Sequence, residues 1–204
     1  MRSEREILAR NMKRRGIELI CCADRQEALS YILGRIQAGA SVCWGGSVTL
    51  REIGLTEAFI NGPYAVIDRA AAKNGDELRR VFASCMLADY FFCSANAITE
   101  AGELVNIDGN GNRVACLAYG PKKVFVIAGK NKLVGSVQEG IERVRTIAAP
   151  KNAVRGGYKT GCLREGICVD CYLPECMCGQ ILITRFNRIP GRINVILIEE
   201  DLGY

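Results

Sequence analysis

Hydrophobic residues recur along this chain in short runs, and between the runs they return with the spacing of one helix face. Runs of four or five apolar residues bounded by turn residues predict buried strands. One more apolar strand is expected near the end of the chain, after a Gly- and Cys-rich stretch. The other predicted strands occupy residues 17–21, 41–44, 65–68, 90–93, 104–107 and 124–128.

Helical segments separate these runs. Residues 76–88 have apolar positions at helical spacing, and Ser136 with Glu139 forms the start signal of another helix. Pro150 is expected to end that second helix, because proline removes a helical hydrogen bond and its ring clashes with the preceding turn. The chain therefore alternates predicted strands with predicted helices.

This alternation predicts an α/β fold built on an open, mainly parallel sheet with helices on both faces. A chain of 204 residues suits one substantial domain. We expect residues 1–204 to form that domain, with a Cys-rich metal-binding loop at about residues 158–180. Ligands of such sheets bind at the carboxyl ends of the strands.

Composition excludes several classes of function. The chain has no histidine, which rules out Ser-His-Asp catalysis and every zinc site that uses imidazole. Its net charge of +5 comes from scattered basic residues, so no nucleic-acid ligand is expected. No apolar stretch approaches the ~18–20 residues of a membrane span. Because the N-terminus also lacks the apolar segment of a signal peptide, we expect a cytoplasmic protein.

Five of the eleven cysteines lie within seventeen residues, and this is the sharpest local signal. Cytoplasmic thiols stay reduced, so such a cluster favours metal binding, with unliganded loop or core thiols as the alternative. Cys168 and Cys171 form a C-x2-C pair that Cys162 and Cys178 complete, leaving Cys176 spare. A single such pair with irregular spacing favours a [4Fe–4S] cluster, and zinc remains the alternative. The other six cysteines are expected in the core.

A polar, Gly-rich stretch over residues 96–113 is the second candidate site. Its Asp-Gly and Asn-Gly pairs are also explained by tight turns without any function. It lacks the residues of a calcium loop and the third glycine of a dinucleotide motif. With the Gly-rich loop at residues 45–49, it suits an anionic small molecule. The ligand-binding candidates are Gly45, Gly46, Ser47, Thr49, Asn96, Thr99, Asp108, Asn110, Asn112, Arg113 and Lys122.

Two carboxylates are the candidates for catalysis. Glu52 and Glu100 lie in the candidate ligand loops at residues 45–52 and 96–113, where an acid could serve as general acid, base or nucleophile. They are nominated because the chain has no histidine for these roles.

The runs at residues 45–55, 97–106, 109–115 and 120–124 resemble the lactate-utilisation (LUD) domain family. The resemblance extends from about Asn11 to Tyr204, and the chain resembles a short, Cys-bearing member. It implies the fold shared by glucosamine-phosphate deaminase, ribose-phosphate isomerase and CoA-transferases. It also implies a link to the iron–sulfur-dependent oxidation of lactate to pyruvate, in which some members take part.

Three functions follow as hypotheses. The favoured one is an enzyme or oxidoreductase-complex subunit linked to lactate or small organic-acid utilisation. It would bind an iron–sulfur cluster and a small anionic metabolite, either a carboxylate, a phosphate ester or a CoA ester. The alternatives are a thiolate-metal (Zn) binding or regulatory module without catalysis, and a non-catalytic assembly partner of an oxidoreductase.

Overall fold

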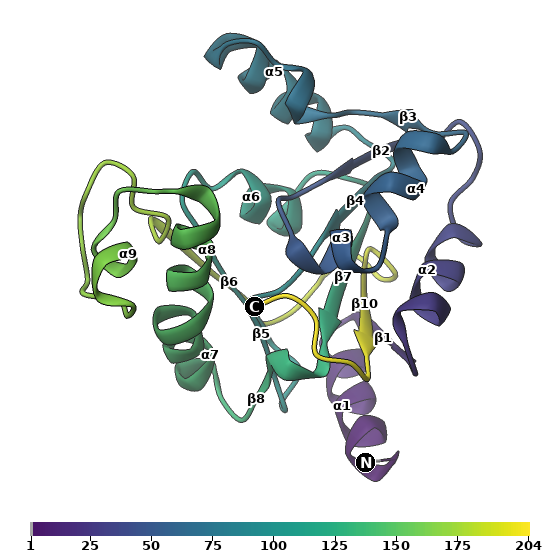
Figure 1. Cartoon of the computed structure of the whole chain (residues 1–204). Helices are drawn as coiled ribbons and strands as arrows, with labels where there is room; N and C mark the ends of the chain where they lie inside the picture. The colour runs from purple at the N-terminus through teal and green to yellow at the C-terminus, as the bar shows by residue number, and fades with distance from the viewer. Residues whose placement is uncertain (1) are drawn as a thin grey trace.

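A six-stranded sheet whose strands are all parallel forms the centre of the protein (Figure 1). The computed structural model describes residues 2–204, so Met1 of the expected domain lies outside the described residues. The strand order is β1-β10-β7-β4-β2-β3, which confirms the predicted α/β fold with a mainly parallel sheet. The strands are β1 (Ile17–Cys22), β2 (Ser41–Trp44), β3 (Ala65–Val66), β4 (Tyr90–Cys93), β7 (Lys123–Gly129) and β10 (Ile193–Ile198).

Helices cover both faces of this sheet because its central strands are apolar on both sides. In β7, Val124 and Val126 join the core on one face, whereas Phe125 and Ile127 join the core on the other. The first face packs against α1 (Arg2–Arg14), α5 (Gly75–Met86) and α6 (Asn112–Ala118). The second face packs against α2 (Arg25–Leu33), α3 (Val48–Glu52) and α4 (Leu55–Asn61).

A second, four-stranded sheet lies beside the first, in the order β8-β5-β6-β9. Residues 104–107 form a strand as predicted, but it runs antiparallel to β5 in this second sheet. Only four residues separate β5 from β6, which is enough for a hairpin and too few for the crossover of a parallel pair. The strands are β5 (Ala97–Thr99), β6 (Leu104–Asp108), β8 (Leu133–Val134) and β9 (Gln180–Thr184).

One continuous helical stretch covers the second sheet. It consists of α7 (Val137–Arg143), the π-helical turn η3 (Val144–Ala148) and α8 (Ala149–Gly156). Ser136 caps it by accepting the N–H of Glu139, as predicted. The prediction that Pro150 ends the helix is wrong, because the stretch continues to the end of α8. The wider π turn directly before Pro150 shifts the carbonyl that the proline ring would otherwise meet.

The remaining elements are short. After β7 comes η2 (Lys130–Lys132), before α5 comes η1 (Arg69–Ala71), and the loop between α8 and β9 contains only α9 (Gly161–Glu165). None of the helices in residues 2–204 is long and apolar enough to cross a membrane.

The six cysteines expected in the core divide into two groups. Cys21 is exposed, and it points to the opposite face of the edge strand β1 from its buried neighbour Cys22. The other five are buried, namely Cys22, Cys43, Cys85, Cys93 and Cys116.

Candidate functional site

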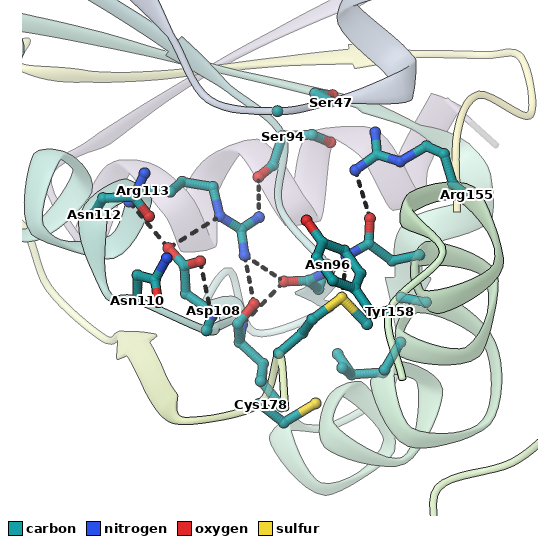
Figure 2. A pocket seen from close by; sticks show the side chains of 18 of the residues that line it. Ser47, Ser94, Asn96, Asp108, Asn110, Asn112, Arg113, Arg155, Tyr158 and Cys178 are labelled. Carbon is teal, nitrogen blue, oxygen red and sulfur yellow. Dashed lines mark hydrogen bonds and ion pairs between the residues drawn. The ribbon is translucent and has the colours of Figure 1, made fainter. Parts of the chain in front are cut away.

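A cavity of about 700 Å³ lies at the carboxyl ends of three neighbouring parallel strands, β7, β4 and β2 (Figure 2). Each strand leads into a residue of the cavity wall: Gly46 after β2, Ser94 after β4 and Lys132 after β7. The opposite wall comes from the end of β6, the start of α6, helix α8 and residues 174–178. Open α/β sheets bind their ligands at this edge.

The Gly-rich loop between β2 and α3 forms one wall. A Cβ atom at Gly46 would lie 2.8 Å from Nη2 of Arg69, so the absence of a side chain lets this guanidinium lie across the loop. Ser47 accepts the N–H three residues ahead and so caps α3, while Thr49 is fully buried behind it. Gly45 lies outside the cavity wall, and its N–H donates to a carbonyl of β4.

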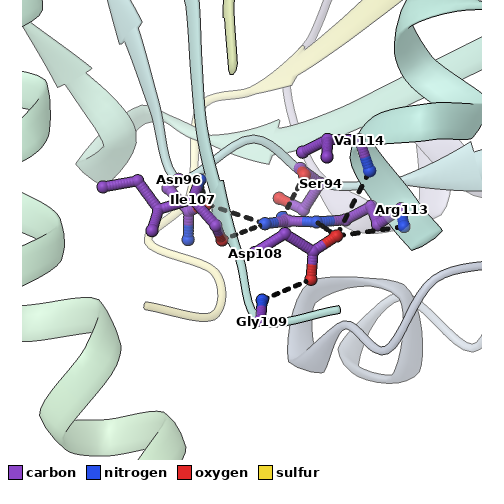
Figure 3. A network of polar contacts seen from close by, with 7 residues as sticks. All are labelled: Ser94, Asn96, Ile107, Asp108, Gly109, Arg113 and Val114. Carbon is purple, nitrogen blue, oxygen red and sulfur yellow. Dashed lines mark hydrogen bonds and ion pairs between the residues drawn. The ribbon is translucent and has the colours of Figure 1, made fainter. Parts of the chain in front are cut away.

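Arg113 is the centre of a polar network (Figure 3). Its Nη1 donates to the carbonyl of Ser94 at 3.1 Å, and its Nη2 donates to Oδ1 of Asn96 at 3.0 Å and to the carbonyl of Ile107 at 2.6 Å. The Asp108 carboxylate lies 3.8 Å from Nε of Arg113 and accepts three backbone N–H groups near the start of α6. These side chains fasten β4, β6 and α6 to one another at the cavity wall.

Lys132, like Ser94 and Arg69, is a cavity residue that the sequence analysis missed. Its side chain is only 2% exposed, and Nζ donates to Oγ of Ser94 at 2.7 Å and to Oγ1 of Thr49 at 2.9 Å. The pKa of Lys132 is lowered to about 7, mainly by burial and in second place by the nearby guanidinium groups of Arg143 and Arg113. The one sequence signal is its position, three residues beyond a strongly apolar strand.

Segment 199–204 covers this lysine from the outside. The side chain of Asn131 accepts the N–H of Leu202 and donates to the carbonyl of Gly203. Tyr204 reaches the cavity wall, where its hydroxyl donates to Oδ1 of Asn152. The amine of Lys132 is thereby shielded from bulk water while it still borders the cavity.

The two nominated catalytic acids do not line the cavity. Glu52 is exposed at the end of α3, where Oε2 accepts the N–H of Gly203 at 2.6 Å. Glu100 is exposed in the β5–β6 turn, and its carbonyl accepts a hydrogen bond from Asn11 of α1. Thr99 shares that turn and is hydrogen-bonded to Glu103.

Lys122 lies at the opposite edge of the sheet. Its side chain is 77% exposed and pairs with Asp89 at 2.7 Å. A residue that precedes a parallel strand lies at the amino edge, and Lys122 directly precedes β7. Besides Lys122, the predicted ligand-binding residues Gly45 and Thr99 lie outside the cavity wall, and the structure brings the others together there. The residues brought together are Gly46, Ser47, Thr49, Asn96, Asp108, Asn110, Asn112 and Arg113.

The cavity wall carries more positive than negative charge. Its carboxylates are those of Asp108, which is engaged with Arg113, and Glu175, which accepts the N–H of Lys159. Within residues 2–204, the guanidinium group of Arg69 makes no hydrogen bond or ion pair. The cationic side chains of the wall are Arg69, Arg113 and Arg155.

The clustered cysteines lie beside this cavity, and Cys176 and Cys178 form part of its wall. Burial raises the pKa of Cys178 to about 12, and the four other thiols of the cluster act in the same direction. The N–H of Gly161 lowers the pKa of Cys171. Among the described residues, no three Cys, Asp or Glu side chains are arranged to hold a metal ion. Cys162 is buried, and Cys168, Cys171, Cys176 and Cys178 are half-buried.

Comparison with known proteins identifies both a family and a fold. The LUD domain family model matches residues 5–198. A DUF162 family protein from Deinococcus radiodurans, known from a crystal structure, is similar with a TM-score of 0.55 and 14% identity. That alignment covers 97% of this chain and 97% of the other, and at this identity it supports the fold alone. No curated protein matches this chain.

Proposed function

The chain belongs to the LUD domain family, and from this premise we propose that it acts in the utilisation of lactate or a related small organic acid. In this proposal the acid, or its phosphate or CoA ester, binds as an anion in the cavity at the carboxyl ends of β7, β4 and β2. Such a role is that of an enzyme or of a subunit of an oxidoreductase complex.

The observation that carries the proposal is the unpaired guanidinium of Arg69 at the cavity wall. The guanidinium of Arg113 already donates to two protein carbonyls and to Asn96. Its main role is therefore to position the cavity wall and not to bind a ligand. Arg69 and Arg155 are exposed and can turn toward a ligand. Guanidinium groups bind carboxylates and phosphates through paired hydrogen bonds. The cavity volume of about 700 Å³ has room for an ester as well as for a free acid.

We also propose that Cys162, Cys168, Cys171 and Cys178 hold a [4Fe–4S] cluster. The chemistry of these residues supports this assignment, because the Cys-rich segment supplies thiols and no imidazole. A backbone N–H also donates to the thiol of Cys171. Bound there, the cluster would supply one-electron transfer beside the cavity wall. Zinc is the alternative, and it would make the loop structural.

Metal analysis of anaerobically purified protein tests the cluster. The proposal expects about four iron atoms per chain and an absorption band near ~400 nm. Cys168→Ala should lose the iron, whereas Cys21→Ala, which changes an exposed thiol outside the loop, should keep it. About one zinc atom and no colour would contradict the cluster and support the zinc alternative.

Titration calorimetry tests the anion site with lactate, pyruvate, a sugar phosphate and acetyl-CoA. At least one should bind saturably, and Arg69→Ala should weaken that binding about tenfold or more, because a charge-assisted hydrogen bond is lost. Arg10→Ala, which removes an exposed arginine from α1, is the matched control and should not change affinity. Absence of binding across the panel would contradict the proposal.

A further inference from the structure

We propose that Ser94 and Lys132 form a nucleophile–base pair for acyl transfer, in which Thr49 orients the amine. The inference shares the cavity with the proposed function and rests on that cavity as the ligand site, but it requires neither lactate nor a metal cluster.

The geometry of the three side chains is that of an activated nucleophile. Oγ of Ser94 lies 2.7 Å from Nζ of Lys132, and Oγ1 of Thr49 lies 2.9 Å from the same nitrogen. A nucleophile within hydrogen-bond distance of a base that a third group orients is the arrangement shared by Ser-Lys enzymes. Ser94, Lys132 and Thr49 all line the cavity, so the pair faces the space in which a substrate would bind.

The position of the pair in the fold also suits catalysis. Ser94 directly follows β4 and Lys132 lies just beyond β7, and these two strands are hydrogen-bonded neighbours. Arg113 donates to the carbonyl of Ser94 and so restrains the backbone that carries the nucleophile. Side chains on rigid strand ends keep the short distances that proton transfer requires.

The surroundings favour an uncharged amine. A buried lysine that serves only the fold is normally paired with a carboxylate, whereas Lys132 contacts two neutral hydroxyls. The ionisable groups that act on it are Arg143 and Arg113, which disfavour the ammonium form, and Glu52 and Cys93, which favour it when they are ionised. Burial has the largest effect, and it holds the pKa near 7, where a general base works best.

The reaction balances without an external oxidant or reductant. Oγ of Ser94 forms a bond to the acyl carbon of an ester or thioester, and the bond from that carbon to the leaving oxygen or sulfur breaks. The hydroxyl proton passes to Nζ of Lys132 and then to the leaving group. Water attacks the resulting acyl-serine in the same way, with its proton again accepted by Lys132, and this releases the acid and restores Ser94. The substrate class is therefore an acyl ester or thioester with an anionic group for Arg69.

Labelling with a fluorophosphonate tests the pair, because this probe phosphonylates activated serines. The full-length protein is incubated with the probe, and mass spectrometry locates the adduct. An adduct on Ser94 is expected, with a rate that rises as the pH passes about 7. Lys132→Met should slow labelling about 100-fold and abolish that pH dependence. Ser84→Ala, which changes an exposed serine of α5, should not change the rate.

The wild-type result decides the proposal even if Lys132→Met does not fold. No adduct on Ser94 in folded wild-type protein would overturn it, as would labelling that a folded Lys132→Met or a folded Thr49→Val leaves unchanged. Calorimetry on Ser94→Ala separates this inference from the proposed function. If the protein binds an anion but wild type is not labelled at Ser94, only the Ser94–Lys132 pair is refuted. If wild type is labelled at Ser94 but no anion binds, only the proposed ligand is refuted.

Discussion

The amine of Lys132 lies 2.7 Å from the hydroxyl of Ser94, although the two residues are 38 positions apart in the chain. Parallel pairing of β4 with β7 brings them together, because residues that follow neighbouring parallel strands meet at one edge of the sheet. The contact between Lys132 and Ser94 therefore depends on the topology of the sheet, and no local sequence motif predicts it.

Stability should depend on pH through this lysine. Above about pH 7 its amine is uncharged in the folded protein, whereas in the unfolded chain it keeps its proton up to its ordinary pKa of 10.5. The unfolded state then binds more protons, so the free energy of unfolding rises with pH in this window. Urea titrations of wild type and Lys132→Met at about pH 6.5 and about pH 8.5 measure it. The free energy of unfolding of wild type minus that of the variant should increase with pH. A constant or falling difference would contradict the lowered pKa of Lys132.

Arg113→Lys should destabilise the protein. An ammonium group cannot reach the carbonyls of Ser94 and Ile107 and the amide of Asn96 at once, so buried acceptors lose their donor. The free energy of unfolding should fall by about 2–4 kcal/mol in denaturant titrations. Lys122→Ala is the control and should leave the midpoint unchanged, because its ion pair is exposed. Equal losses in the two variants would argue against a fastening role for Arg113.

Gly129→Ala should displace segment 199–204. A Cβ atom at Gly129 would lie 2.5 Å from the carbonyl oxygen of Glu200 and from the nitrogen of Leu202, and neither backbone atom can move freely. The expected loss of stability is about 1–3 kcal/mol, with faster hydrogen exchange in the displaced segment. Gly75→Ala has open space around its Cβ, so it should leave both measurements unchanged or slightly raise stability. Unaltered exchange in Gly129→Ala would contradict the tight contact.

The buried thiols should resist alkylation in the native protein. Burial raises the pKa of Cys93 and of Cys116 to about 12, and both are almost fully shielded. At about pH 8 iodoacetamide should modify the exposed Cys21 well before either of them. Timed alkylation followed by peptide mass spectrometry gives the order, and all three thiols should react once the protein is denatured. Early modification of Cys93 would mean that the core opens.

The strands of the parallel sheet were predictable because they are buried on both faces. Residues 41–44, 90–93 and 124–128 read as continuous apolar runs, and the structure confirms each as a strand. By contrast, β5 has three residues and β8 has two, so their conformation depends on pairing with distant segments and not on local preference.

The candidate site was predictable only where a motif marked it. The Gly-rich loop with Gly46 and the polar stretch with Asn96 and Arg113 meet at one cavity. Lys132 and Arg69 are single basic residues that belong to no sequence motif. Lys132 matters because it is buried beside the cavity, and Arg69 matters because its guanidinium lies at the cavity wall. Neither property can be read from neighbouring residues in the chain.

The position of β10 between β1 and β7 determines when the fold can be completed. Residues 193–198 pair with both neighbours, and within residues 2–204 strand β1 pairs with β10 alone. During synthesis, β1 therefore emerges long before the strand that attaches it to the sheet. Until then β7 keeps an unpaired apolar edge that can associate with other chains. Fragments that stop before residue 193 should consequently aggregate, and assembly of the sheet should be slow because it depends on such a long-range contact.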